Sequence, residues 1–186
     1  MHKSPWELSY ITHKTEKAFL NYIRGGIRQG IWKKAPVKLA FLSQRKTQRM
    51  INKASGRMCN HNQCEICEEW IANPGKNMEV DHKNPTNGFS CIEDAGRFIQ
   101  DLVYISMDDL QHLCKPCHQI KTLADKRNIS FEVAKLEKEV IKVMKLKSSH
   151  LKKWLNTRGA VYLTPAKVNE DMVRSIIIEE TSNYAL

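Results

Sequence analysis

Apolar residues near the start of this chain recur at the spacing of an α-helix. Phe19, Ile23 and Ile27 lie four positions apart, with Tyr22 beside them, which predicts an amphipathic helix that begins near Thr15. The two glycines at 25–26 are expected to weaken or kink this helix, because glycine has low helix propensity. Arg24 and Arg28, beside these apolar residues, lie one helical turn apart.

A second helix is predicted from Val37 to about Asn52. Ala35-Pro36 ends any helix that follows Trp32, because the residue before a proline avoids the helical conformation. The basic residues of this predicted helix can then lie on one face and contact phosphates.

Two short stretches have the alternation of β-strands. Lys76–His82 alternates apolar and polar residues, and Leu110–Cys114 is expected to return as the second strand of a hairpin. Residues 54–77 are polar and rich in turn residues, so we expect a loop there.

The rest of the chain is predicted to be helical. A capping box, Ser90 to Glu93, indicates the start of a helix that ends before Asp108. Three further helices are expected: Cys117–Lys126, a long helix capped by Ser130 that runs to about Leu155, and Pro165–Glu179. We interpret the apolar stripe of the long helix as protein core.

Length and composition limit the possible classes of protein. A chain of 186 residues suggests one domain, or one compact core with helical arms. No apolar run is long enough to span a membrane, and the first residues lack the apolar segment of a signal peptide. We therefore expect a cytosolic protein whose six cysteines are reduced thiols or metal ligands.

The net charge of +10 indicates a polyanionic partner. Residues 1–57 carry thirteen Lys or Arg against two acids, a net charge of +11, which leaves −1 for all remaining residues. The sequence thus predicts that the basic surface is N-terminal.

Two cysteine knuckles dominate the candidate chemistry. Cys64-Glu-Ile-Cys67 and Cys114-Lys-Pro-Cys117 each present two thiolates from one tight turn, and together they predict a tetrahedral structural zinc site. Cys59 with His61 forms a competing ligand set, whereas Cys91 opens a helix. We expect Cys59 and Cys91 to be free thiols, since neither has the two-residue knuckle spacing.

The motifs between and after the knuckles extend this pattern. They are Val80-Asp-His82, and Asp108-Asp-Leu-Gln-x-Leu followed by Cys-x-x-Cys-His-x-x-Lys-Thr. Over about residues 58–128 the chain resembles the HNH endonucleases, the ββα-metal or His-Me finger nucleases, in their small phage-encoded, homing-type form. The resemblance implies an α+β protein with a zinc-stapled ββα-metal core, and metal-dependent cleavage of DNA.

The resemblance also assigns roles to individual residues. His82 would be the general base, a role that suits imidazole because its pKa lies near neutrality. Asp81 and His118 would hold a catalytic Mg2+ or Mn2+. On a regular strand Asp81 and His82 point to opposite faces, so we expect the strand to twist or end between them.

Asp109 stands where the family has an asparagine that fixes the loop of the base. An ionised carboxylate accepts hydrogen bonds but cannot donate them. Either Asp109 still fixes the loop as an acceptor, which we favour, or the site is slow or uses another metal arrangement.

Nine basic residues are candidates for contacts with DNA phosphates, which dominate nucleic-acid affinity. They are Arg24, Arg28, Lys33, Lys34, Lys38, Arg45, Lys46, Arg49 and Lys121. Any one of them can equally be a solvated surface residue. As a block beside a nuclease-like motif, they favour DNA as the partner.

The sequence therefore predicts three parts: a basic helical arm (1–57), a nuclease core with zinc (58–128) and a helical extension (129–186). Its favoured partner is double-stranded DNA, cut on one or both strands by a monomer or a homodimer. The main alternative is a non-catalytic, zinc-stabilised DNA-binding or regulatory protein in which Asp109 marks a decayed site. A plain zinc ribbon and an RNA substrate are weaker alternatives.

Overall fold

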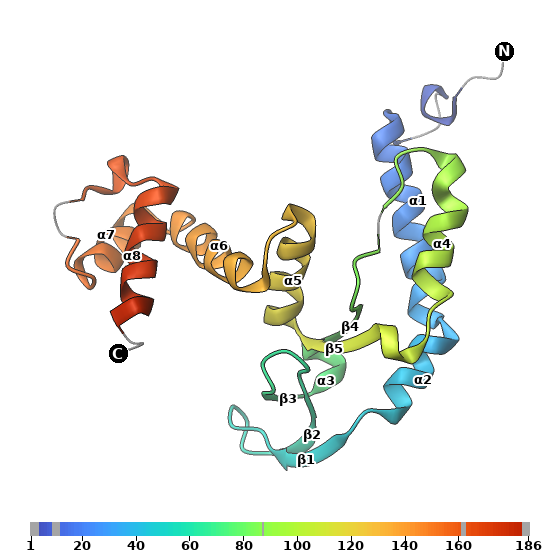
Figure 1. Cartoon of the computed structure of the whole chain (residues 1–186), viewed down its shortest axis with the longest axis horizontal. Helices are drawn as coiled ribbons and strands as arrows, with labels where there is room; N and C mark the ends of the chain where they lie inside the picture. The colour runs from blue at the N-terminus through green and yellow to red at the C-terminus, as the bar shows by residue number, and fades with distance from the viewer. Residues whose placement is uncertain (1–3, 9–11, 87, 161–162, 184–186) are drawn as a thin grey trace. The chain divides into compact units, whose positions relative to one another are not determined.

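The computed structural model describes residues 4–8, 12–86, 88–160 and 163–183, and side chains as far as residue 180. It contains two compact units, residues 1–115 and 116–186. In the first unit (Figure 1) the elements are η1 Pro5–Glu7, α1 Glu16–Gly30, η2 Trp32–Lys34, α2 Pro36–Gln44, β1 Thr47–Ile51, β2 Met58–Gln63, β3 Trp70–Ala72, α3 Pro74–Asn77, β4 Met78–His82, η3 Ile92–Asp94, α4 Ala95–Val103, η4 Met107–Asp109 and β5 Leu110–Cys114. The combination of helices with small antiparallel sheets confirms the predicted α+β class.

The predicted N-terminal helix is present as α1. Thr15 caps it, because its hydroxyl oxygen accepts a hydrogen bond from the Ala18 amide at 3.2 Å. The helix continues through the two glycines at 25–26 as far as Gly30, so they do not interrupt it. Packing along its length outweighs the low propensity of the glycines.

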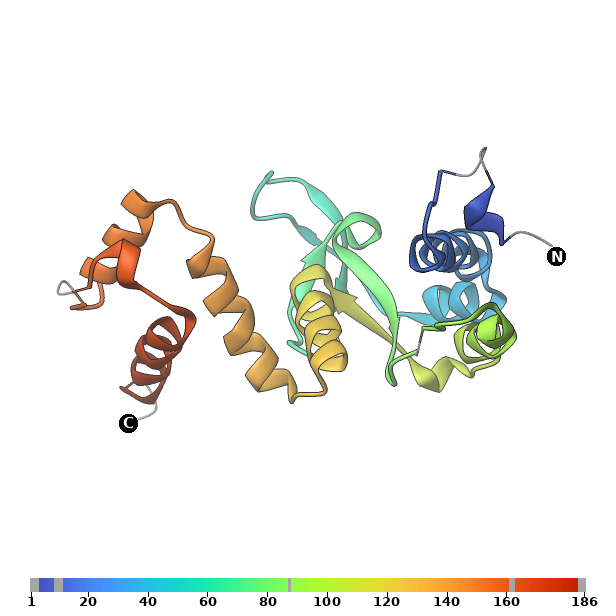
Figure 2. The ribbon, with the colours of Figure 1, turned by 90° about the horizontal axis from the view of Figure 1, so that it is seen from above.

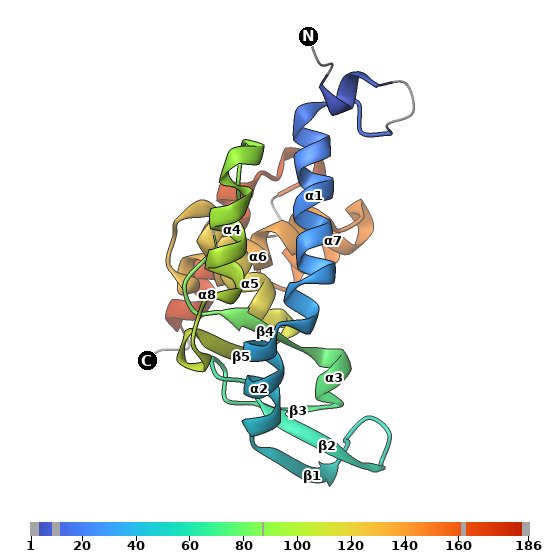
Figure 3. The same ribbon diagram turned by 90° about the vertical axis from the view of Figure 1, so that its right-hand side faces the viewer.

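One face of α1 packs against α4. Leu20 on α1 joins Phe89, Phe98 and Leu102 in a buried cluster, and Phe89 and Phe98 pack with their ring centroids 5.4 Å apart. Figures 2 and 3 show the two helices side by side, with α2 continuing from the end of α1 toward β1. The N-terminal arm is therefore part of the fold of the first unit and is not a separate appendage.

The prediction of a helix to Asn52 is wrong beyond Gln44. Arg45 takes an extended conformation, and the chain then forms β1, which pairs antiparallel with β2 from Thr47↔Asn62 to Ile51↔Met58. The loop predicted for residues 54–77 is also wrong, since β2, β3 and the short α3 lie within it. The three strands form one sheet in the order β1-β2-β3.

The two predicted strands of the hairpin are confirmed. β4 and β5 pair antiparallel along their full length, from Met78↔Cys114 to His82↔Leu110. Every residue of β5 is buried, and Met78, Val80 and His82 are the buried positions of β4. The chain runs from β5 directly into the helix α5.

The helix predicted to start at Ser90 begins later. Cys91 is the N-cap of η3 without a side-chain cap, and α4 starts at Ala95, so the predicted capping box does not form. Ile92, the first residue of η3, is 51% exposed. Phe98 provides the buried contact instead.

The second unit is helical, with α5 Lys115–Arg127 starting one residue before it, then α6 Phe131–Met144, α7 Ser148–Asn156, η5 Pro165–Lys167 and α8 Glu170–Asn183. The hydroxyl of Ser130 accepts from the Val133 amide at 3.2 Å, which confirms the predicted cap. The long helix predicted to Leu155 is divided in two at residues 145–147.

The break in the long helix lets α7 fold back on the same core. Val140, Val143, Leu151, Leu155 and Val173 are buried together, so the apolar stripe of α6 is core, as predicted. Among the described helices, none is long and apolar enough to cross a membrane.

The contact between α1 and α4 leads to a prediction about the stability of the first unit. Phe98→Ala removes a side chain that is 2% exposed, and we expect it to lower the free energy of unfolding by about 3 to 5 kcal/mol. Ile92→Ala, three residues before the start of α4, is the control and should have little effect. Urea unfolding of both variants measures this, and equal stabilities would contradict the packing.

Candidate metal centre and the neighbouring histidine

Four cysteines from the two knuckles form a cluster. The Sγ atoms of Cys64, Cys67, Cys114 and Cys117 all lie within 4.8 Å of one another. No other group of three or more His, Cys, Asp or Glu ligand atoms gathers in this way within the described residues. The set matches the four thiolates that hold a structural zinc. The predicted grouping of these four cysteines is therefore confirmed.

The first knuckle is closed by backbone hydrogen bonds. The Cys64 amide donates to the Glu69 carbonyl at 3.0 Å, and the Glu68 amide donates to the Cys64 carbonyl at 2.9 Å. Glu68 has a φ of 58°, in the left-handed region that glycine or asparagine usually occupies. This turn directs both thiols of the knuckle to the same side.

The first knuckle is also hydrogen-bonded to β5. The Glu65 amide donates to the His112 carbonyl at 3.1 Å, and Glu65 Oε1 accepts from the His112 amide at 2.7 Å. Two residues further along the strand, the Cys114 amide donates to Cys64 Sγ at 3.3 Å. This role of Glu65 was not predicted from the sequence, although Glu65 is one of the two residues inside the knuckle.

These amides prepare Cys64 to bind a metal. Burial opposes the thiolate, but the backbone amides of Cys67, Cys114 and Ile66 outweigh it and lower the pKa of Cys64 to about 7. A thiol with this pKa is half ionised at neutral pH, so little free energy is needed to deprotonate it for zinc. The four side chains therefore fit a zinc ion.

The other two cysteines lie outside the cluster. Cys59 Sγ is 3.8 Å from His61 Nδ1 on β2, and the thiol of Cys91 donates to Asp94 Oδ2 at 3.1 Å. Both are present as thiols and not as disulfides, as expected. The competing set of Cys59 and His61 gathers no third ligand within the described residues.

His82, the predicted base, is the last residue of β4 and is only 7% exposed. Its Nε2 lies 3.0 Å from the carbonyl oxygen of Leu102 on α4. Because a carbonyl can only accept, Nε2 carries a proton in this contact, so in the neutral ring the lone pair is on Nδ1. The main chain therefore sets the tautomer of the neutral ring.

An aromatic ring also packs against the imidazole of His82. The Trp32 ring packs on the imidazole with the centroids 4.5 Å apart, and the Lys38 ammonium lies 4.8 Å from the centroid of the same indole. Burial lowers the pKa of Lys38, while Glu79 acts in the opposite direction. From the sequence Trp32 was expected only to mark a helix end, and its packing on His82 was not predicted.

Asp81 lies on the opposite face of the strand from His82. β4 stays paired with β5 through His82, and burial alternates along it, with Asp81 half-buried between the buried Val80 and His82. Of the two expected possibilities, the strand does not end between these residues, because His82 is still paired with Leu110. His118, the third predicted residue, lies in the first turns of α5 and is half-buried.

Asp109 accepts hydrogen bonds, but from its own turn. Its Oδ2 accepts from the amide and the hydroxyl of Ser106, each at 2.8 Å, and these contacts lower the pKa of its carboxyl group. The segment after the histidine is held by backbone instead, since the Lys83 amide donates to the Asp109 carbonyl at 2.8 Å. The favoured prediction, that the Asp109 side chain fixes this loop directly, is corrected accordingly.

A hollow of about 380 Å³ adjoins His82. Its wall consists of the segment after β4, the end of α4 and the turn before β5. Nine residues line it: His82, Asn84, Pro85, Thr86, Gln100, Asp101, Tyr104, Ile105 and Asp109. Only His82 and Asp109 were predicted from the sequence as site residues, because the others come together only through the packing of α4.

The predicted DNA contacts fall into two groups. Lys33, Lys34, Lys46 and Arg49 are exposed, whereas Arg45 is half-buried. Three others lie on aromatic rings: Lys38 on Trp32, and two arginines of α1, Arg24 over Phe89 and Arg28 over Phe98. The four exposed residues of the first group, and Arg28, which is also exposed, have the solvent access that phosphate binding requires.

Lys121 does not fit the prediction of a phosphate contact. It is 8% exposed, and its ammonium pairs with Asp125 Oδ2 at 2.5 Å, one turn along α5. The distance favours a structural ion pair within the helix. Lys121 is therefore neither placed for a DNA contact nor freely solvated.

The remaining charge is not evenly spread. Residues 58–115 carry four Lys or Arg against ten acids, a net charge of −6, while residues 116–186 carry thirteen against eight, a net charge of +5. The prediction of a basic surface at the N-terminus alone is therefore incomplete. An acidic segment, which contains the histidine and three of the four cysteines, separates two basic ones along the chain.

The cysteine cluster predicts that the first unit depends on metal. Because a structural zinc supplies on the order of 10 kcal/mol in small metal-dependent domains, Cys67→Ser should abolish zinc binding and cooperative unfolding together. Elemental analysis should find about one zinc per chain in the unmutated protein. Cys91→Ser, outside the cluster, should keep both properties. A protein that stays folded after complete chelation would exclude a structural metal.

No family model, curated protein or solved structure matches this chain. Its function must therefore be inferred from the side chains themselves. The relevant features are the cysteine cluster, the histidine with a fixed tautomer and the hollow beside that histidine.

Proposed function

We propose that this protein is a metal-dependent DNA endonuclease of the HNH type, with His82 as its general base. The observation that carries the proposal is the environment of His82. A carbonyl fixes its Nε2 proton, an indole holds its ring, and a hollow adjoins it. An imidazole with a fixed neutral tautomer beside open space has the geometry that a general base requires.

The proposed reaction is hydrolysis of a phosphodiester. A water oxygen attacks phosphorus while the proton of that water passes to Nδ1 of His82. The bond between phosphorus and the 3′ oxygen breaks, and the leaving oxygen takes a proton from solvent. The products are a 5′ phosphate and a 3′ hydroxyl, as the resemblance to the HNH family implies.

The ligands of the catalytic cation remain those that the resemblance assigns, Asp81 and His118. A carboxylate and an imidazole suit Mg2+ or Mn2+, and such a cation, when bound, stabilises the negative charge that develops on phosphorus oxygens. Zinc at the four cysteines would have a separate, structural role, because it would hold the first knuckle against β5, the strand that pairs with β4.

Double-stranded DNA is the substrate that the charge distribution supports best. The exposed basic residues at 33–34 and 46–49 flank α2, in the same unit as His82. They supply positive charge that the acidic segment around the histidine lacks. Phosphate contacts of this kind position a duplex without reading its sequence.

A second candidate function is non-catalytic DNA binding. The observation that favours it is the 7% exposure of His82, because a buried, hydrogen-bonded and stacked histidine also has a structural explanation. The basic residues and the cysteine cluster fit this function equally well. The two candidates differ in cleavage and in the effect of replacing His82.

The catalytic test is conversion of supercoiled plasmid to open-circular or linear form with Mg2+ or Mn2+. His82→Ala should lower the rate by at least ~10² and leave DNA affinity nearly unchanged, since a general base contributes about 10² to 10⁴. Asp81→Ala and His118→Ala should also lose cleavage, and the double variant should be little worse than either, because residues that serve one metal are not additive.

The control for this test is His150→Ala, an exposed histidine of α7. It should cleave at the unmutated rate. If His82→Ala also cleaves at that rate, His82 is not the base. If the unmutated protein binds DNA but never cleaves it, the non-catalytic function is correct.

The DNA surface predicts a change in salt dependence. Replacing Lys33, Lys34, Lys46 and Arg49 by Gln should weaken binding and reduce the slope of log K against log salt by about 0.9 per lost phosphate contact. Fluorescence anisotropy across a range of salt concentrations measures it. The matched double variant Lys152→Gln, Lys153→Gln in α7 should leave the slope unchanged, and a larger effect there would place the duplex on other residues.

A further inference from the structure

The hollow beside His82 is unlike a phosphate site. Two carboxylates, Asp101 and Asp109, stand on its wall, and among its lining residues there is no lysine or arginine. Repulsion from two carboxylates disfavours a phosphate inside the hollow. Its volume of about 380 Å³ lies within the range of small-molecule sites, so a neutral ring can enter.

Tyr104 supplies an aromatic surface at this hollow. It follows α4 directly and is 81% exposed, the highest exposure found among the large apolar and aromatic side chains of the described residues. Pro85 and Ile105 add further apolar surface nearby. A base that leaves its stack finds an equivalent surface on such a side chain, because every nucleobase has a π-face.

Polar groups at the hollow match the edge of a base. Asn84 and Gln100 present amides, each with donors and an acceptor, and Thr86 presents a hydroxyl. Amide side chains pair with base edges, and a carboxylate such as Asp101 accepts from an exocyclic amino group. Asp109 Oδ2 already accepts from Ser106, so Asp101 is the acid suited to this contact.

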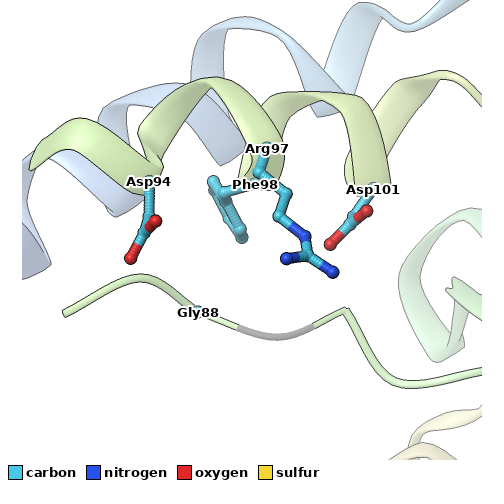
Figure 4. A pocket seen from close by; sticks show the side chains of 5 residues that line it. All are labelled: Gly88, Asp94, Arg97, Phe98 and Asp101. Carbon is cyan, nitrogen blue, oxygen red and sulfur yellow. The ribbon is translucent and has the colours of Figure 1, made fainter. Parts of the chain in front are cut away.

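A neighbouring hollow on α4 shows the contrast. It has a volume of about 240 Å³ and shares Asp101 with the first, but it is lined by Asp94, Arg97, Phe98 and Gly88 (Figure 4). Arg97 extends between two acids, and the only ring, that of Phe98, is 2% exposed. This second hollow offers no exposed ring on which a base can stack.

We propose that the hollow beside His82 binds the nucleobase adjacent to the scissile phosphodiester, taken out of its stack, with Tyr104 stacking on it and Asn84, Gln100 and Asp101 contacting its edge. This inference rests on the proposed endonuclease function. It places the phosphate of that nucleotide at His82 and its base in the hollow. The contacts to the base edge then set the sequence preference at the cut.

The first experiment maps cleavage sites on a plasmid by sequencing the ends. Tyr104→Ala should lower kcat/KM by about 5- to 150-fold, the effect of losing one stacked base, whereas Tyr104→Phe should retain the rate. Gln100→Ala should relax the base preference at one position beside the cut. Tyr22→Ala, a tyrosine of α1 that is 58% exposed, is the control and should change neither.

The second experiment tests for direct contact between the tyrosine and the base. A duplex with the mapped cut receives an abasic nucleotide at the position beside the cut. For this substrate Tyr104→Ala should have no further effect, because the two changes remove the same contact. A loss of the same size on the abasic and the intact duplex would overturn the inference.

The outcomes separate the two proposals. If cleavage requires His82 but Tyr104→Ala cuts with the unmutated rate and preference, the base site is wrong and the endonuclease stands. If His82→Ala cleaves like the unmutated protein, or no cleavage occurs with either cation, the proposed function fails and the base site fails with it. Thermal unfolding of each variant verifies that these exposed substitutions leave the fold intact.

Discussion

The attachment of the first cysteine knuckle to β5 is the constraint on which the rest of the first unit depends. The Glu65 amide donates to the His112 carbonyl, and the Glu65 carboxylate accepts from the His112 amide. The Cys114 amide donates to Cys64 Sγ. These contacts bring Cys64 and Cys67 of the first knuckle close to Cys114 at the end of β5 and Cys117 in α5. Because the same strand pairs with β4 along its full length, the position of the knuckle also determines where His82 lies.

The second constraint acts on His82 from the opposite direction. α1 and α4 share a small aromatic and aliphatic core, and through it the Leu102 carbonyl and the Trp32 ring reach the imidazole. The end of β4 that carries His82 is held against this helix pair, which leaves little freedom for the ring. Such rigid placement is what a general base needs, since its efficiency depends on geometry as well as on pKa.

The distribution of charge agrees with separate sites for chemistry and for affinity. The segment that holds the histidine is acidic, and the basic residues with free access to solvent lie on neighbouring elements of the same unit. Acidic groups near a proposed cation site favour the cation and oppose direct binding of phosphate. In the proposed function, the exposed basic residues of the other elements would supply the affinity for a polyanion. Several predicted phosphate contacts have another role, as Arg24 and Lys121 illustrate by packing on a ring and pairing with an acid.

Local patterns in the sequence predicted the features that depend on neighbouring residues. Alternation indicated the two strands of the hairpin, capping chemistry the caps at Thr15 and Ser130, and knuckle spacing the four candidate cysteine ligands. Each of these signals extends over a few residues, whereas the approach of the two knuckles, with Cys64 and Cys114 50 positions apart, is made by the tertiary structure.

The tertiary structure alone decided what depends on distant contacts. The strand β1 replaced a predicted helix because it pairs with β2, and the long helix was divided because α7 packs back on the core of α6. The role of Trp32, the acceptor at Leu102 and the hollow with Tyr104 arise from residues near α1, α4 and β4 that are separated by 20 to 70 positions. No local pattern encodes these approaches, because they result from how the buried faces of whole helices and strands pack together.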